Sequence, residues 1–285
     1  MIPTFLYFDT PCVFARSLPV LKSILGSWLG SSPSTGTTTR PYDIVYPLDY
    51  LPVANSAQML LIDQFIDDMS HHLSAKVTKF SIREEWKVSH PDGTPDDVDL
   101  YLENVITQTF YYEFYHTTDN FRKVYRESHD GRPPYVIPFV QRRQAKGAAV
   151  TAEQHEAAMQ KLKVYKDWLL DVVFARGGKE ILVVLPIANV EANYRDELSP
   201  SPDEQSALDQ LFVSPILQAP DIMVPIGEVT YQSKISRRTE VLPVLLNVVG
   251  APNTDFQLLE AVEKVLTLSK RPTSVATGTR MFPSS

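Results

Sequence analysis

The stretch from Ala219 to Leu266 constrains the fold most, because its pattern predicts strand, loop, strand, turn and helix in that order. Two short apolar runs rich in β-branched residues, Ile222–Ile226 and Val241–Val249, are typical of neighbouring buried strands. A breaker cluster, residues 250–253, ends the second run before the helix. We interpret the segment as a βαβ-like piece of a layered α/β core. The predicted helix has one apolar face, formed at spacings of three and four by Leu258, Leu259, Val262, Val265 and Leu266.

Length and charge limit the class of protein. The chain has 285 residues and is 44% hydrophobic, enough for one large domain or two ordinary ones with a substantial core. Its net charge of −7 argues against a nucleic-acid partner, because phosphate binding needs clustered lysine and arginine. Two local exceptions, residues 234–238 and 141–146, are either solvated basic loops or patches facing an anionic ligand.

Two absences favour a reducing compartment. The single cysteine, Cys12, excludes an internal disulfide framework, and the sequence has no site for N-glycosylation. The apolar run at the N-terminus is short and is interrupted by Asp9, unlike a signal peptide. No apolar run approaches the roughly 18 residues of a membrane span. We therefore expect a soluble, cytoplasmic protein.

The first third of the chain alternates between predicted strands and helices. We expect a strand over Ile2–Phe8, a turn at Asp9-Thr10-Pro11, and a helix from Ala15 to Leu29. The next predicted strands are Tyr42–Tyr46 and Lys76–Ile82. Between them, Asn55 or Ser56 can cap a helix that ends near Leu73. Five apolar residues of this helix are expected to point inward: Met59, Ile62, Phe65, Ile66 and Met69.

In the middle of the chain, the pattern predicts a helical excursion from the alternation of strands and helices, over about residues 84–178. After an acidic, turn-rich stretch, one long helix is expected from Asp97 or Asp99 to Arg126, and a second from Thr151 to Ala175. A buried strand over Ile181–Leu185 follows. Residues 201–204 fit a capping box for a helix through Phe212.

The order of elements indicates the α/β class, with a mixed sheet flanked by helices around a central helical excursion. We expect one domain over residues 1–268 and a flexible tail over residues 269–285.

Known catalytic and cofactor patterns are missing from the sequence. We find no nucleophile elbow, Ser-X-X-Lys, dinucleotide fingerprint, phosphate loop or His-Glu-X-X-His motif. Side chains of the adjacent pair His71 and His72 diverge on a helix, so they are a poor metal chelate. Cys12 has no histidine near it in sequence to act as a base. We therefore expect no metal and no cofactor.

Motifs at both ends of the chain resemble one enzyme family. Phe8-Asp9-Thr10-Pro11, followed by Phe14-Ala15-Arg16-Ser17, resembles the Asp-Thr-X-Gly and Ala-Arg-Ser segments of amidase-signature enzymes. The far end is similar to the closing strands and helix of that family, and the surroundings of Tyr231, Ser233 and Arg237 resemble its fungal-type branch. The matching far-end residues are Pro220-Asp221-Ile222, Val224-Pro225-Ile226-Gly227, Leu242-Pro243, Val248-Val249-Gly250, Thr254-Asp255 and Leu258-Leu259.

The resemblance implies the C-terminal half of the amidase-signature fold without its catalytic groups. The family hydrolyses a carboxylic amide C–N bond with a Ser-Ser-Lys triad, in which the lysine must be neutral to relay a proton. Those residues precede the Asp-Thr motif in the family, and here that motif begins at Asp9. Cys12 also stands where the family has glycine. We therefore expect no catalytic residue in this chain and no activity from it alone.

Two interpretations remain open. The chain is either a truncated or split amide hydrolase, or a non-catalytic protein of amidase descent that binds a ligand or partner. In the complete form the first implies a small amide substrate, and it allows self-association or pairing with a missing N-terminal half. The residues that the resemblance favours as pocket or supporting groups are Asp9, Thr10 and Tyr231. Asp9 and Thr10 could instead satisfy backbone groups in a turn.

Overall fold

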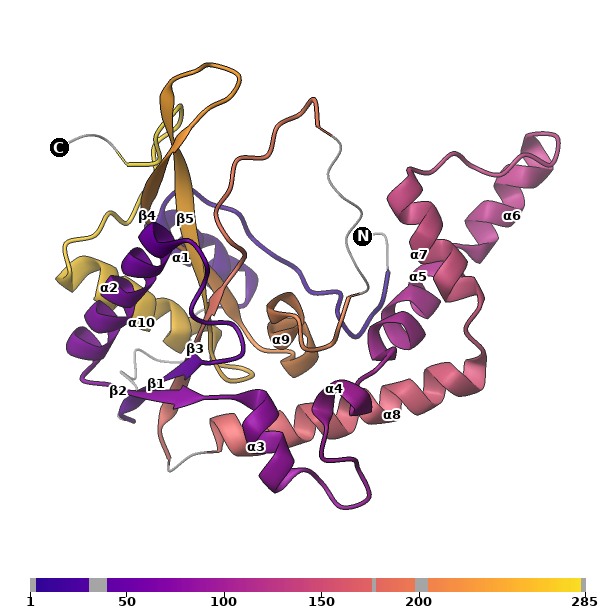
Figure 1. Cartoon of the computed structure of the whole chain (residues 1–285), viewed down its shortest axis with the longest axis horizontal. Coiled ribbons are helices and arrows are strands. Elements are labelled where there is room, and N and C mark those ends of the chain that lie inside the picture. The colour runs from indigo at the N-terminus through magenta and orange to yellow at the C-terminus, as the bar shows by residue number, and fades with distance from the viewer. Residues whose placement is uncertain (1–3, 31–39, 176–177, 198–204, 283–285) are drawn as a thin grey trace. The chain divides into compact units, whose positions relative to one another are not determined.

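The computed structural model describes residues 4–30, 40–175, 178–197 and 205–282, which form two compact units (Figure 1). The first unit combines Met1–Thr10, Trp86–Leu169 and Ser199–Gln218, and the second combines Pro11–Glu85, Leu170–Leu198 and Ala219–Ser285. The α/β class predicted from the sequence is confirmed, because a five-stranded mixed sheet is flanked by helices. Within the described residues, every helix is too short or too polar to cross a bilayer.

The second unit contains the sheet, with strand order β2-β1-β3-β5-β4. Strand β1 is parallel to β2 and β3, while β5 is antiparallel to β3 and β4. Strand β3 lies at the centre and is buried along almost its whole length, as its unbroken apolar run predicts. The strands are β1 Tyr42–Pro47, β2 Lys76–Phe80, β3 Glu180–Pro186, β4 Asp221–Gln232 and β5 Thr239–Val249.

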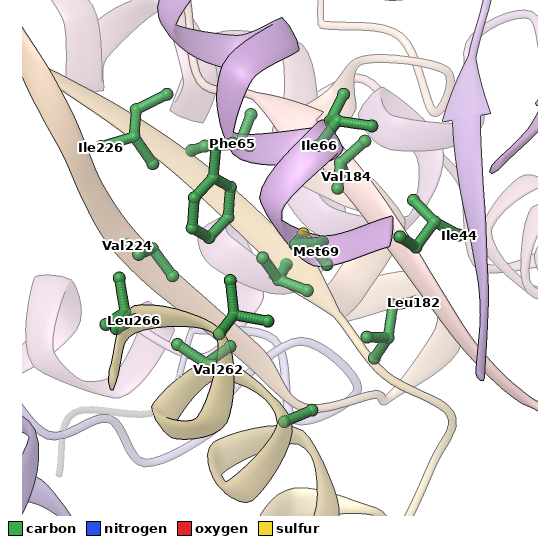
Figure 2. Close-up of a cluster of buried hydrophobic side chains, with 14 of the residues drawn as sticks. Ile44, Phe65, Ile66, Met69, Leu182, Val184, Val224, Ile226, Val262 and Leu266 are labelled. Atoms are coloured by element: carbon green, nitrogen blue, oxygen red, sulfur yellow. The ribbon is translucent and has the colours of Figure 1, made fainter. Parts of the chain in front are cut away.

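Helices α2 (Ser56–Leu73) and α10 (Asp255–Leu268) pack against the sheet and against each other. The Asn55 side chain accepts hydrogen bonds from the first amides of α2, the cap predicted from the sequence. Helix α1 (Leu18–Trp28) adds partly buried leucines to the same core. Figure 2 shows how side chains from three strands and two helices meet there: Ile44, Phe65, Ile66, Met69, Leu182, Val184, Val224, Ile226, Val262 and Leu266.

The first unit is helical over its described residues. Its core includes Trp86, fully buried, with its ring against those of Tyr101, Tyr165 and Trp168. Helix α3 (Ile82–Ser89) crosses the boundary between the units in sequence. The other elements of this unit are α4 Val98–Tyr101, the π-helix η1 Thr107–Tyr111, α5 Tyr112–His116, α6 Asp119–Ser128, α7 Pro138–Ala148, α8 Ala152–Leu169 and α9 Gln210–Leu217.

The closing segment differs from its prediction in topology. Strands β4 and β5 form an antiparallel hairpin followed by α10, so the βαβ-like interpretation is wrong. The loop over residues 233–238 is too short for the crossover that parallel neighbours need. Both strands are also longer than predicted, because polar residues continue them beyond the buried apolar runs.

The strand predicted over Ile2–Phe8 is wrong for the described residues, since residues 4–8 form a turn. The Asp9 carboxylate accepts hydrogen bonds from the amides of Thr4 and Phe5, at 2.8 and 3.2 Å, and folds the chain back. The aromatic side chains therefore pack on one another within the turn. Ring centroids of Phe5 and Phe8 are 4.7 Å apart.

The helical excursion has more breaks than the periodicity predicts. Asp97 is an N-cap as expected, yet α4, η1, α5 and α6 replace one long helix. The stretch predicted to be turn-rich contains α3, because Trp86 is buried among aromatic rings. Helix α7 was not predicted, and α8 ends at Leu169 before a second π-helix, η2 (Leu170–Phe174). Of the predicted capping box, residues 201–204 lie outside the described residues, and the helix there begins only at Gln210.

Candidate functional site

A group of polar side chains gathers at the free end of the β4–β5 hairpin in the second unit. We call it the hairpin-end cluster, and it includes Tyr231, one of the residues predicted from the sequence. The hairpin carries most of it, and the segment that follows β3 supplies the rest. Its members are Tyr194, Glu197, Tyr231, Ser233, Lys234, Ser236 and Glu240.

The hairpin loop is closed by its own backbone. Ser233 donates from its amide to the Arg238 carbonyl at 3.0 Å, and its own carbonyl accepts from the Arg237 amide at 2.9 Å. The Ser233 hydroxyl is buried and accepts from the amide of Ser236. Arg237 adopts a positive φ of 56°, which lets the chain reverse. The loop therefore holds the cluster side chains in a defined arrangement.

Glu240 accepts hydrogen bonds from two hydroxyl groups, one on β4 and one in the loop. Tyr231 and Glu240 are opposite each other in the hairpin register, and the Tyr231 hydroxyl donates to Glu240 Oε2 at 2.6 Å. The Ser236 hydroxyl donates to Glu240 Oε1 at 2.5 Å. These bonds lower the pKa of Glu240, the one from Ser236 most, and the bond to Glu240 raises the pKa of Tyr231. Glu240 is thus held as a carboxylate and Tyr231 as a neutral phenol.

Lys234 ties the loop to the segment after β3. Its backbone amide donates to the Tyr194 hydroxyl at 3.0 Å, and its ammonium lies 4.3 Å from the centroid of the Tyr194 ring. The ammonium also donates to Glu197, which raises the pKa of Lys234. Since Glu197 already neutralises this lysine, Arg237 and Arg238 remain as the exposed cations of the loop.

Gln58 positions the segment that brings Tyr194 to the hairpin. This side chain is completely buried at the start of α2, where it donates to the Ala188 carbonyl at 2.7 Å and accepts from the Val190 amide at 2.8 Å. Asn55 also donates to the Val190 carbonyl. The chain leaving β3 is therefore fixed on α2 before it reaches the cluster. Nothing in the sequence marks Gln58, because a single glutamine forms no pattern.

Asp9 and Thr10 belong to the first unit, whereas Tyr231 belongs to the second. Both carboxylate oxygens of Asp9 are used within its own turn, where Oδ1 accepts from the Thr4 hydroxyl at 2.6 Å and Oδ2 from two backbone amides. These hydrogen bonds give Asp9 the turn-stabilising role that the sequence allows as the alternative to a role in a pocket. Thr10 follows it as an exposed residue.

A second polar pair lies at the other end of the hairpin. The Asn247 side chain of β5 donates to Asp221 Oδ2 of β4 at 3.0 Å, and its own Oδ1 is buried with no hydrogen-bond partner among the residues that the structure describes. Desolvation raises the pKa of Asp221 to about 6. The sequence motif Pro220-Asp221-Ile222 includes this aspartate, but its partner depends on the strand register.

The described residues do not form a recognisable hydrolytic centre. Ser236 contacts a carboxylate, as a nucleophile contacts its base, yet the lowered pKa of Glu240 makes it a weak base. Cys12 is exposed. Within the described part of the chain, no three histidine, cysteine, aspartate or glutamate side chains are grouped to hold a metal ion.

The architecture therefore defines an α/β protein with a mixed sheet and a separate helical unit. No family model matches the sequence. Among solved structures, the chain resembles an amidase at 20% identity with a TM-score of 0.58, over 90% of this chain and 51% of that one. A peptide amidase in complex with the competitive inhibitor chymostatin matches at 14% identity and a TM-score of 0.59, over 95% and 56% of the two chains.

A bacterial aryl acylamidase of the amidase-signature family is also similar, at 14% identity and a TM-score of 0.53. That match covers 83% of this chain and 45% of the acylamidase. The chain thus has a fold found in amidase-signature enzymes, and it spans about half the length of the structures it matches. This confirms the fold expected from the motifs at its two ends.

Proposed function

We propose that this chain forms the C-terminal part of an amidase-signature amide hydrolase of the fungal-type branch, and that it hydrolyses no amide by itself. The observation that supports this is the extent of the fold similarity, between 83% and 95% of this chain but about half of each amidase. A small carboxylic amide is the proposed substrate class of the complete enzyme. The cytoplasm is the proposed compartment, on the basis of the single cysteine.

The proposed inactivity rests on what amide hydrolysis requires. A serine nucleophile needs a deprotonated base of suitable pKa beside it and donors aimed at the oxyanion. The hydroxyl of Ser236 faces a carboxylate whose pKa is lowered. Lys234 has a raised pKa, the opposite of what a proton-relaying lysine needs. A segment carrying the Lys, Ser and Ser residues would have to complete the site.

The residues proposed as binding or supporting groups of the complete enzyme are Asp9 and Thr10 of the first unit and Tyr231 of the second. The hydroxyl of Tyr231 is directed by its hydrogen bond to Glu240. Asp9 would act through the turn that it closes. All three are proposed as binding or supporting groups, and none as a nucleophile.

The direct test is an assay of the purified 285-residue chain on simple aryl and alkyl amides. We expect no release of amine or carboxylate above the buffer rate, while an intact amidase-signature enzyme in the same assay turns them over. Hydrolysis that scales with the concentration of this chain, and that a serine-directed inhibitor stops, would refute the proposed inactivity.

A second candidate function is a non-catalytic protein of amidase descent that binds a ligand or partner. The observation that favours it is the hairpin-end cluster, whose hydroxyl groups are held on a deprotonated carboxylate. The gene sequence upstream of Met1 separates the candidates. An in-frame segment encoding a lysine and a Gly-Ser-Ser-Gly-like run supports the hydrolase. Its absence, together with soluble and monodisperse protein, supports the binding protein.

A further inference from the structure

Arg143 is held on the face of α7 that packs against the π-helix η1 in the first unit. Phe139, Arg143 and Gly147 follow each other at intervals of four residues, so they share one face of α7. A Cβ atom on Gly147 would lie 2.0 Å from the Tyr111 carbonyl oxygen, so only glycine allows this close approach. The approach brings the Arg143 side chain, one turn earlier, against η1.

The Arg143 guanidinium is surrounded by aromatic rings. Its Cζ lies 4.1 Å from the ring centroid of Phe139, 5.3 Å from that of Tyr111 and 5.4 Å from that of Phe110. Such contacts stabilise a cation without neutralising it. The site therefore offers flat apolar surfaces beside a positive charge.

Hydrogen bonds to other described residues occupy few of the donors of this guanidinium. Nη2 donates to Gln205 Oε1 at 2.6 Å, and the Tyr111 hydroxyl donates to the same oxygen at 3.0 Å. Nε is buried and has no hydrogen-bond partner in the described part of the chain. Arginine stays charged at every physiological pH and carries five N–H donors. One neutral amide oxygen is a weak complement for such a group.

Arg122, in the same unit, is a buried arginine whose partners differ from those of Arg143. It donates to the Asp119 carboxylate, to the Thr118 hydroxyl and to the Tyr115 carbonyl, and its guanidinium lies over the Tyr115 ring. Arg143 has the ring contacts, but among the described residues no carboxylate forms an ion pair with it. A half-buried cation without a counter-ion costs free energy unless an anion from outside completes it.

We propose that Arg143 anchors a binding site for a small carboxylate ligand with an aromatic or other flat apolar group. The planar guanidinium matches the two oxygens of a carboxylate, and the partly buried rings of Phe110 and Phe139 provide surfaces for the apolar part. Gln205 holds the guanidinium in place through the shared oxygen. The site lies on the basic stretch over residues 141–146. This is one of the two stretches for which the sequence allows a patch that faces an anionic ligand. It requires no hydrolytic activity.

The test is a calorimetric titration of the full chain with sodium benzoate, and with neutral benzamide as the matched ligand. We expect saturable binding of benzoate, with benzamide at least about tenfold weaker because it lacks the charge. Equal affinity for the two ligands, or no binding of benzoate, would overturn the proposal.

Arg142 provides the matched control, because it neighbours Arg143 in sequence and is exposed. The Arg143→Met variant should weaken benzoate binding at least about tenfold, and Arg142→Met should leave it within about twofold. Arg143→Lys keeps the charge but loses the planar fork, so an intermediate loss is expected. Equal losses in the two Met variants would show that only net charge matters and would contradict the site.

Folding is checked by the thermal unfolding midpoint of each variant, and Arg143→Lys stands in if Arg143→Met fails to fold. Asp203 and Glu204 precede Gln205 in the sequence and lie outside the described residues. The titration is therefore repeated with the Asp203→Asn/Glu204→Gln variant. Retained or tighter benzoate binding supports a ligand at Arg143, and loss of binding contradicts it.

Discussion

The carboxyl group of Asp221 is charged at an energetic cost in the folded protein. Desolvation raises its pKa from 3.8 to about 6, only partly opposed by the hydrogen bond from Asn247. Below pH of about 4 the group is protonated in both folded and unfolded chains. As the pH rises from about 4 to 6, the carboxyl group loses its proton more readily in the unfolded chain than in the folded one. Ionisation therefore favours the unfolded state over this range, and the free energy of unfolding falls.

Replacing Asp221 with asparagine should therefore stabilise the protein at neutral pH. The new amide keeps an acceptor for Asn247 and can donate to its Oδ1, which accepts no hydrogen bond from any described residue. We expect the free energy of unfolding to rise by on the order of 1 kcal/mol at neutral pH, allowing for the exposure of Asp221, and by less below pH of about 4. Urea unfolding at the two pH values measures the difference. An equal gain at both would argue against the desolvated charge as the cause.

The hydrogen-bond partner of a residue could be predicted from the sequence only where that partner is local. Tyr231 was selected by resemblance, and its partner Glu240 depends on the register of two antiparallel strands. A slip of one residue would place Glu240 on the other face of the sheet. Gln58 is still harder to foresee, because its partners at residues 188 and 190 are distant in the chain. In contrast, the Asn55 cap is local and was predicted.

Among the elements, α7 depends most on a single residue. At Gly147 a methyl group would collide with the backbone of η1, at 2.0 Å from a carbonyl oxygen, and no side-chain rotation can relieve that contact. Gly147→Ala should lower the free energy of unfolding by about 2–3 kcal/mol as α7 moves away from η1. Thermal or urea unfolding of the purified variant measures this loss.

Gly26 in α1 is the matched control, since a Cβ there meets nothing within 4 Å. Gly26→Ala should stabilise the protein by about 0.5–1 kcal/mol, because alanine favours the helix and restricts the unfolded chain. Similar effects of the two substitutions would show that helix propensity, and not the contact with Tyr111, dominates at Gly147.

Periodicity predicted elements where one face is apolar and a cap is local. Helix α2 and strand β3 follow their patterns closely, and α10 lies where the spacing of its apolar residues places it. The π-helices η1 and η2 interrupt this pattern, because one extra residue per turn rotates the apolar face. Helix α7 was missed because its packing face contains a glycine and an arginine in place of large apolar residues.

At the scale of the whole chain, the two ends of the second unit are joined. The Leu18 amide donates to the Thr273 carbonyl at 2.9 Å, and the Val275 amide donates to the Arg16 carbonyl at 2.9 Å. The Glu228 carboxylate also accepts a hydrogen bond from the amide of Phe282 at 3.2 Å. These contacts link the start of α1 and strand β4 to residues after α10, which local sequence patterns do not reveal.

Arg271 forms a further link of this kind through its side chain, and its removal tests whether these links stabilise the fold. Its Nε donates to Asp68 of α2 at 2.6 Å, and its Nη1 donates to the Ile226 carbonyl of β4 at 2.9 Å. Both charged groups are partly screened from solvent, so these bonds are worth more than a surface pair. Arg271→Ala should lower the free energy of unfolding by about 1–2 kcal/mol in urea. Lys264→Ala removes an exposed cation from α10 and should change it by less than about 0.5 kcal/mol. If the two variants unfold alike, the residues after α10 do not help to hold the sheet and α2 together.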